Sequence, residues 1–256
     1  MEHASDRNHK IIETYWSSQA PIFTKLYTQG ATTYVQSLQN LEAAFHENDR
    51  TLRCIDERTP GGIHLAGSGI LLPEDEIEHV VKRLKKEGVE GVWSHAHCGA
   101  AALYAQQNNL DMEKGDEYGK EWADTFAKRL GVPYLGHIDS DQLSGPAEFH
   151  IARVAYYVGS SHFDPSRVEG LPPGFVINRG YLSPKYAKFE ADLSVKIATG
   201  EHGFGRLITK ETPFLLIVVA DLKDQSASLK QLKAELSPIE HASGGRVRVD
   251  GFTAPI

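Results

Sequence analysis

The chain has 256 residues and a formal net charge of −7, with 41% hydrophobic and 24% charged residues. This is the composition of an ordinary globular protein that is long enough to bury a sizeable core. The acidic balance leaves no basic footprint, so we expect neither nucleic acid nor an anionic membrane surface as a partner. The longest apolar run, Phe214–Ala220, is far shorter than the roughly 20 residues of a membrane-spanning helix.

The start of the chain, MEHASDRNHKIIETYW, lacks the apolar stretch of a secretory signal, so we expect a cytoplasmic protein. Only two cysteines are present, Cys54 and Cys98. In a reducing compartment such cysteines are more often metal ligands or reactive thiols than a disulfide. The two thiols are therefore the first candidates for chemistry.

The first part of the chain is predicted to be helical. Residues 8–48 carry apolar side chains at spacings of three and four around Gly30, and we expect residues 1–48 to form an N-terminal helical arm. A short apolar segment at residues 52–55 then leads into a turn-rich stretch, ERTPGG. The next segment, IHLAGSGILL, has the length and flanking glycines of a buried strand, or of a strand and its loop.

Several signals together predict a helix over residues 73–87, PEDEIEHVVKRLKKE. Pro73 suits the first turn, acidic residues follow it, basic residues gather at the far end, and Gly88 stops the helix. The segment VEGVWSHAHCG after it is typical of a buried strand that ends in a loop, and AAALYAQQNN opens another helix. The order strand, helix, strand, helix is typical of a parallel α/β unit.

The second half adds a charged amphipathic helix over residues 114–131 and strand candidates in VPYLGHIDSDQL, HIARVAYYVG and PFLLIVVADL. Proline and glycine punctuate the long stretch between the last two, where we expect loops and one helix near residues 184–200. We therefore predict an α/β fold with a central, mostly parallel sheet flanked by helices and an N-terminal helical extension. We expect a single domain, residues 1–256, with its functional core in residues 50–105.

Both cysteines fall where predicted strands end. In open parallel sheets, functional groups gather beyond the carboxyl ends of the strands. Cys54 at one strand end, with His95 and Cys98 at a neighbouring one, would supply two thiolates and one imidazole. Three protein ligands with a vacant fourth position characterise catalytic zinc, whereas structural zinc is usually closed by four. A helix that begins near Gly99 would also favour the thiolate form of Cys98.

The segment after Cys54 adds a carboxylate and a guanidinium. On an extended segment, residues at i, i+2 and i+4 project to one face, so Cys54, Asp56 and Arg58 would point together. The guanidinium keeps the carboxylate ionised and fixes its orientation. Such an aspartate could accept a hydrogen bond from a zinc-bound hydroxide, or could itself occupy the fourth coordination position and switch the site off.

Plainer interpretations exist for each of these residues. An isolated cysteine in an α/β protein is most often a small buried hydrophobic residue, and an Asp-x-Arg pair is usually a loop-bracing ion pair. A structural metal is a further alternative. We interpret Gly67 and Gly69 as sites of close backbone packing, because no complete phosphate-binding glycine pattern is present.

The segments CIDER and HAHCG resemble the Cys-x-Asp-x-Arg and His-x-x-Cys pair of the β-class carbonic anhydrases. The resemblance extends over roughly residues 50–105, with the family's order of glycine-containing strand and loop, helix, strand and metal-binding turn. The remainder of the chain departs from the usual β-class pattern. That long second half, with LPPGFVINRGY, is more similar to the limiting-carbon-dioxide-inducible B protein group, the θ-type relatives of the β-class.

The resemblance implies zinc as the cofactor and reversible hydration of carbon dioxide to bicarbonate by a zinc-bound hydroxide. It implies that Cys54, His95 and Cys98 are the zinc ligands. It also implies that Asp56 and Arg58 are the catalytic pair. The segment HAHC offers two histidines, His95 and His97, for one ligand position, and only His95 has the family's spacing. A proton must also leave the site, and His64 and His97 are the two candidate shuttles.

Two other functions are compatible with the same residues. The first is hydrolysis of carbon disulfide or carbonyl sulfide, which a narrow apolar tunnel would favour over an open cleft. The second is a non-catalytic scaffold that senses bicarbonate or serves assembly and keeps zinc for stability. The families that the chain resembles commonly pair subunits, so we also expect a homodimer.

Overall fold

The computed structural model describes residues 4–46, 48–159, 162–221 and 228–254. Within them, eight strands form two four-stranded sheets, in which every strand pairing is parallel. The first sheet has the order β2 (Ile63–His64), β1 (Thr51–Arg53), β3 (Gly91–His95) and β4 (Tyr134–Ile138). The second has the order β6 (Phe175–Asn178), β5 (Val154–Val158), β7 (Phe214–Ala220) and β8 (Val247–Thr253). The predicted α/β fold with parallel strands is confirmed.

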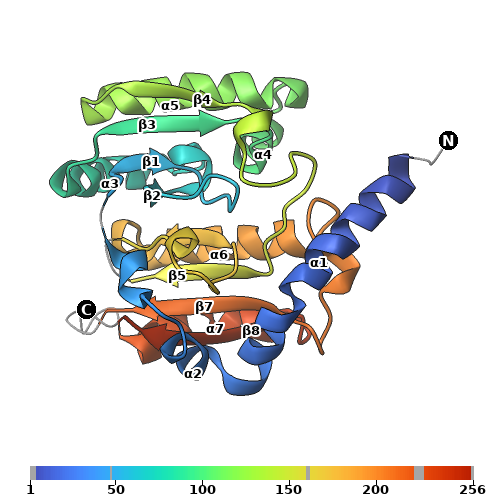
Figure 1. The fold of residues 1–256 in the computed structure, drawn as a ribbon. Coiled ribbons are helices and arrows are strands. Elements are labelled where there is room, and N and C mark those ends of the chain that lie inside the picture. The colour runs from blue at the N-terminus through green and yellow to red at the C-terminus, as the bar shows by residue number, and fades with distance from the viewer. Residues whose placement is uncertain (1–3, 47, 160–161, 222–227, 255–256) are drawn as a thin grey trace.

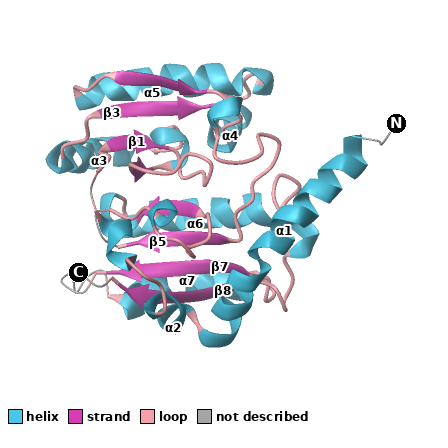
Figure 2. Ribbon diagram, viewed as in Figure 1, coloured by secondary structure: helices cyan, strands magenta, loops and turns pink. Residues whose placement is uncertain are grey.

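Seven α-helices in this described part of the chain flank the two sheets (Figure 2). They are α1 (Ala4–Gln29), α2 (Ala31–Gln36), α3 (Glu74–Glu87), α4 (Gly99–Gln107), α5 (Gly115–Leu130), α6 (Pro184–Thr199) and α7 (Leu229–Ala242). Helices α3 to α5 accompany the first sheet, and α6 and α7 cover one face of the second. The other face of the second sheet is covered by α1 and α2, so the predicted N-terminal extension is helical.

The core follows the two-residue period of the strands. In β5, Val154, Tyr156 and Val158 pack with α1 and α2, whereas Ala155 and Tyr157 belong to the cluster on the opposite face. All seven residues of β7, FLLIVVA, are buried, because helices lie on both faces of the sheet. An uninterrupted apolar run is therefore what this position in the fold requires.

The two sheets meet edge to edge through β2 and β6 (Figure 1). The backbone N–H of Val176 donates to the Ile55 carbonyl over 3.1 Å, and the N–H of His64 donates to the Asn178 side chain over 2.7 Å. One cluster of buried hydrophobic residues continues from the helices of the first sheet to those of the second. The strands thus divide between two adjoining sheets, where the sequence analysis describes one central sheet, and the single domain stays a prediction.

Helix α3 shows how the local sequence determines an element. Pro73 is its N-cap, and Gly88 ends it in the left-handed conformation with φ 76°. Acidic residues lie in its first turn and lysines in its last, in agreement with the helix dipole. Its buried face consists of Ile77, Val80, Val81 and Leu84.

Three elements of the structure, β6, α7 and β8, were not predicted from the sequence. The predicted N-terminal arm also differs in detail, because Gly30, with φ 78°, separates α1 from α2, and a short 3₁₀ turn follows at Leu41–Phe45. Residues 1–3 and 47 of that arm lie outside the described residues. Among the helices that the structure describes, none combines the length and apolar character needed to cross a membrane.

Candidate metal centre

The candidate metal centre lies where the strand order of the first sheet reverses. From β1 the chain moves to β2 on one side and then returns to β3 on the other side of β1. The crevice beyond the carboxyl ends of β1 and β3 is therefore the expected position of a site in this fold class. Cys54 follows β1 directly, His95 ends β3, and Cys98 is the N-cap of α4.

The ligand atoms of Cys54, His95 and Cys98 lie within 4.8 Å of one another, and all three residues are buried. The two sulfurs are 4.0 Å apart. Two sulfurs at the usual zinc distance of about 2.3 Å in a tetrahedral site are separated by roughly 3.8 Å. The spacing of this thiol pair therefore suits a metal ion bound between the sulfurs.

The imidazole of His95 is oriented for the same role. Its Nδ1 lies 2.9 Å from the carbonyl oxygen of Ala96, which can only accept a hydrogen bond, so Nδ1 carries the proton. Nε2 then has a free lone pair, and this buried atom has no hydrogen-bond partner in the structure. A metal ligand would account for such an orphaned acceptor, and the carbonyl contact is the usual outer support of a ligating histidine.

Backbone amides support the two sulfurs. The N–H of Gly67 donates to Cys54 Sγ over 3.2 Å. The hydrogen bond from Cys54, together with amides in the first turn of α4, lowers the pKa of the Cys98 thiol. Burial raises the pKa of Cys54 well above its ordinary value. When no metal is bound, Cys54 is therefore the thiol of the pair that stays protonated to higher pH.

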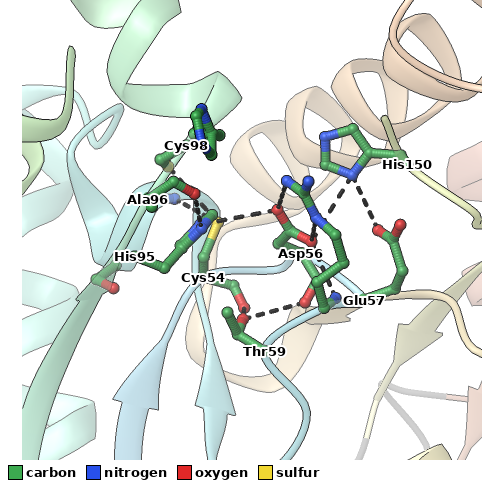
Figure 3. A network of polar contacts seen from close by, with 12 residues as sticks. Cys54, Asp56, Glu57, Thr59, His95, Ala96, Cys98 and His150 are labelled. Atoms are coloured by element: carbon green, nitrogen blue, oxygen red, sulfur yellow. Dashed lines mark hydrogen bonds and ion pairs between the residues drawn. The ribbon is translucent and has the colours of Figure 1, made fainter. Parts of the chain in front are cut away.

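Asp56 and Arg58 form a buried ion pair. Asp56 lies next to the metal-ligand candidates Cys54 and His95 (Figure 3). Arg58 Nε donates to Asp56 Oδ1 over 2.9 Å and its NH2 group donates to Oδ2 over 2.7 Å. The guanidinium is itself held by the carbonyls of Pro146 and Ala147. Burial raises the pKa of Asp56, but the charges of His150, Arg58 and His95 outweigh burial and hold it well below its ordinary value.

The carboxylate of Asp56 faces the metal ligands, with Oδ2 lying 3.8 Å from His95 Nε2. The extended segment that the sequence analysis assumed is absent here, because β1 ends at Arg53 and the chain turns immediately afterwards. The N–H of Thr59 closes this turn on the Asp56 carbonyl over 3.0 Å. The turn, rather than strand alternation, brings Cys54 and Asp56 together.

A cavity of 610 Å³ opens beside Arg58 and the thiol of Cys98. Small or apolar residues of α4 and α6, such as Ala102, Leu103 and Ile197, line one part of it. Arg58, His97, His150 and His202 line it together with the acidic residues Glu113, Asp116 and Glu148. The metal group is thus reached from a cavity of mixed polarity.

The two predicted proton shuttles lie in different surroundings. His64 is buried, its Nδ1 lies 2.6 Å from the Cys54 carbonyl, and burial lowers its pKa to about 4. His97 is exposed at the cavity, where its Nε2 lies 2.9 Å from Ser140 Oγ. His97 is not part of the group formed by Cys54, His95 and Cys98, so the spacing argument selects the histidine that the structure places there.

The structure also brings together two residues that the sequence analysis did not select. Glu57 and His150 form a buried pair, with 3.0 Å between Glu57 Oε2 and His150 Nδ1. Glu57 stands inside the CIDER segment, between the two members of the predicted pair. His150 lies 93 positions away, and no spacing in the sequence connects the two.

Cys54, His95 and Cys98 thus form a group that could hold a metal ion, next to a carboxylate fixed by arginine. The identity of the metal is part of the proposal below. Compared with known proteins, the chain matches no protein-family model, no curated protein and no solved structure.

Proposed function

We infer that the protein is a zinc-dependent carbonic anhydrase that catalyses the reversible hydration of carbon dioxide to bicarbonate. The observation that carries this proposal is the group of Cys54, His95 and Cys98 beside an aspartate that Arg58 holds ionised. These residues are the ones for which CIDER and HAHCG resemble the β-class anhydrases. Membership of the limiting-carbon-dioxide-inducible B protein group is part of the same proposal.

The donor set favours zinc over the hard cations. Two thiolates and one imidazole are ligands typical of zinc, whereas magnesium and calcium prefer oxygen. Three protein ligands are also the number found in catalytic zinc sites. When bound, zinc would act as a Lewis acid and lower the pKa of a coordinated water toward neutrality.

Asp56 has the position and charge to orient the attacking water. Its pKa lies well below the ordinary value, so the carboxylate accepts hydrogen bonds and does not donate them throughout the neutral range. Arg58 contacts both carboxylate oxygens and prevents the side chain from rotating freely. A water between Asp56 and the ligands would therefore donate one proton to Oδ2 and direct its lone pair elsewhere.

The cavity suits a small uncharged substrate that becomes an anion. Ala102, Leu103 and Ile197 offer apolar surface to carbon dioxide, which has no charge to satisfy. Arg58 lines the same cavity and favours the negative charge that develops on the product oxygens. The apolar lining thus suits carbon dioxide, and the guanidinium of Arg58 suits bicarbonate.

Two observations favour hydration over the alternatives. The cavity carries charged residues, among them Glu113, Asp116 and Glu148, and so lacks the narrow apolar lining that would favour carbon disulfide or carbonyl sulfide. Arg58 engages both oxygens of Asp56, which argues against an aspartate that blocks the metal as in a switched-off scaffold. The homodimer stays a prediction, which light scattering at micromolar concentration would test.

Stopped-flow hydration of carbon dioxide by zinc-loaded protein, with Asp56→Asn beside the wild type, tests the proposal. We expect Asp56→Asn to keep stoichiometric zinc and to lose most of the turnover, because the asparagine side chain lacks the negative charge that orients the attacking water. The variant also leaves Arg58 unpaired in the interior, which can cost about 3–5 kcal/mol of stability. Circular dichroism therefore accompanies the assay, and Asp56→Asn combined with Arg58→Gln removes both buried charges where the single variant does not fold. A folded, zinc-loaded Asp56→Asn protein with full activity would refute the role of Asp56.

A further inference from the structure

Glu57 and His150 form a pair that the roles described so far do not use. The side chains are 0% and 8% exposed, respectively. Glu57 Oε1 accepts a hydrogen bond from the Ile151 amide over 2.7 Å, which leaves Oε2 for the imidazole of His150. The backbone of His150 is fixed as well, because its N–H donates to the His202 carbonyl over 2.7 Å. The relative position of carboxylate and imidazole is thus determined from both sides.

The pairing determines which ring nitrogen exchanges protons. An ionised carboxylate only accepts hydrogen bonds, so the 3.0 Å contact with Glu57 Oε2 requires the proton on His150 Nδ1. Nε2 then carries the lone pair. Figure 3 shows this second nitrogen on the side of the ring that points away from both carboxylates. The same logic orients the histidine of a catalytic triad, where a buried carboxylate fixes the tautomer and leaves Nε2 to act as the base.

His150 lies on the wall of the cavity that Arg58 and Cys98 also line. Its Nδ1 is 3.7 Å from Asp56 Oδ1, so the ring borders the aspartate that we assign to the attacking water. The ring packs against Phe175, with 5.4 Å between the ring centroids, and this contact restricts its rotation. A single cavity therefore joins Cys98 and Arg58 to an imidazole with a free nitrogen.

The charges around His150 come from Glu57, Asp56 and Arg58. Burial and the Arg58 guanidinium disfavour the imidazolium, but the two carboxylates outweigh them and raise the pKa of His150 above its ordinary value. The ring therefore takes up a second proton more readily than an ordinary histidine does. This property agrees with the position of the ring and is measurable by itself.

A second metal site is a poorer explanation for the same residues. The ligand atoms of Asp56, Glu57 and His150 do lie within 4.8 Å of one another. However, the carboxylates of Asp56 and Glu57 already accept hydrogen bonds from Arg58, the Ile151 amide and His150. The cationic guanidinium of Arg58 would also repel a metal cation at this position.

We propose that His150 is the proton-transfer residue of this site and that Glu57 is the positioning residue that fixes its tautomer. The proposal rests on the proposed function. Carbon dioxide and water yield bicarbonate and one proton. That proton, passed along cavity water, forms a bond to His150 Nε2 and is then released to water or buffer. His150 takes the place of the two histidines that the sequence suggested. His64 is already engaged with the Cys54 carbonyl and its free nitrogen is buried, and His97 Nε2 already contacts Ser140 Oγ.

The kinetic test compares the wild type with His150→Ala, and with His150→Gln where the alanine variant does not fold. Hydration is followed at pH 8.5 in dilute buffer. We expect kcat to fall by on the order of tenfold to a hundredfold, since a general acid or base contributes about 10²-fold or more. The ratio kcat/KM should change less than about threefold, because it does not contain the proton transfer to solvent. Added imidazole should restore kcat. His79→Gln, which changes an exposed histidine of α3 that does not line this cavity, is the matched control and should leave both parameters unchanged.

Glu57→Gln tests the positioning role. Its carbonyl would retain the Ile151 amide and its NH2 group would face His150 Nδ1, which forces the proton to Nε2. We expect a loss of kcat similar to that of His150→Ala and a shift of the kcat profile to lower pH. Nitrogen NMR of the His150 ring gives a readout that needs no turnover, and it should show the Nδ1–H tautomer in the wild type and the Nε2–H tautomer in Glu57→Gln.

The outcomes separate this proposal from the function on which it rests. A wild-type protein that binds zinc but does not hydrate carbon dioxide overturns the proposed function. If the wild type is active, three results would overturn only the role of His150. In His150→Ala, kcat and kcat/KM could fall together without rescue by imidazole, or kcat could stay unchanged. The third result is an Nε2–H tautomer of the wild-type ring.

Discussion

Glu190 on α6 offers a quantitative test of the structure behind the metal ligands. Its side chain is 0% exposed, and its Oε1 accepts the Ala66 amide over 2.7 Å. Its Oε2 is buried without a hydrogen-bond partner. Burial raises the pKa of Glu190 to about 8, against the opposing effect of the Ala66 hydrogen bond. Glu190→Gln mimics the protonated form, because the amide oxygen can keep the bond to Ala66.

The magnitude follows from linkage. The folded protein keeps the proton of Glu190 up to about pH 8, whereas the unfolded chain loses it near the ordinary value of 4.5. The folded state therefore binds more protons between these values, and the free energy of unfolding falls as pH rises through this window. Each pH unit in this window lowers the free energy of unfolding by about 1.4 kcal/mol, so the whole window lowers it by on the order of 5 kcal/mol. Glu190→Gln does not suffer this loss.

Urea unfolding of wild type and Glu190→Gln at pH 5, 7 and 9, with zinc saturating throughout, measures the difference. We expect similar stabilities at pH 5 and a variant more stable by several kcal/mol at pH 9. Taking the difference between the two proteins cancels the pH dependence of zinc binding. Glu78→Gln changes an exposed glutamate on α3 and should show no such trend. A difference between wild type and Glu190→Gln that is independent of pH would refute a buried, protonated Glu190.

Two further predictions concern the metal ligands. Zinc affinity should increase with pH, by up to about tenfold per unit, because binding displaces the proton of Cys54, whose pKa burial raises. Chelator competition at pH 6.5, 7.5 and 8.5 measures it, and a constant affinity would contradict the ligand assignment. Gly67→Ala should cost about 1–3 kcal/mol of unfolding free energy and weaken zinc binding, since Gly67 has φ 56° and a Cβ there would lie 2.6 Å from Ile70 Cγ2. Gly131→Ala also has positive φ but meets nothing within 4 Å, so equal effects of the two changes on stability and zinc binding would argue against the packing at Gly67.

The candidate ligand group could be predicted from the sequence because its members lie in two short segments at strand ends. Cys54 follows β1 and the HAHC segment follows β3, and parallel neighbouring strands place these segments in one crevice. Helix α3 was equally accessible, because its proline, charge distribution and terminal glycine are local signals. Features that depend on one segment and its immediate neighbours could therefore be predicted.

Features that depend on distant packing could not. His150 meets Glu57 only because the segment before β5 folds back across the end of β1, and neither residue carries a signal of that contact in its own neighbourhood. The division into two sheets is decided at β2, which has only two residues and adjoins β6 through a few backbone and side-chain contacts. β6 itself has four residues that follow a proline and glycine segment, so its strand pattern is too short to be read.

The most direct test of the account is the initial rate of carbon dioxide hydration at pH 8.5 as a function of bound zinc. Protein stripped by a chelator and then restored in steps should gain activity in proportion to zinc, up to one zinc per chain. Cys98→Ser should bind little zinc and remain inactive under the same titration. A rate that does not depend on zinc, or a chain saturated with zinc that does not exceed the uncatalysed rate, would contradict the proposed carbonic anhydrase activity.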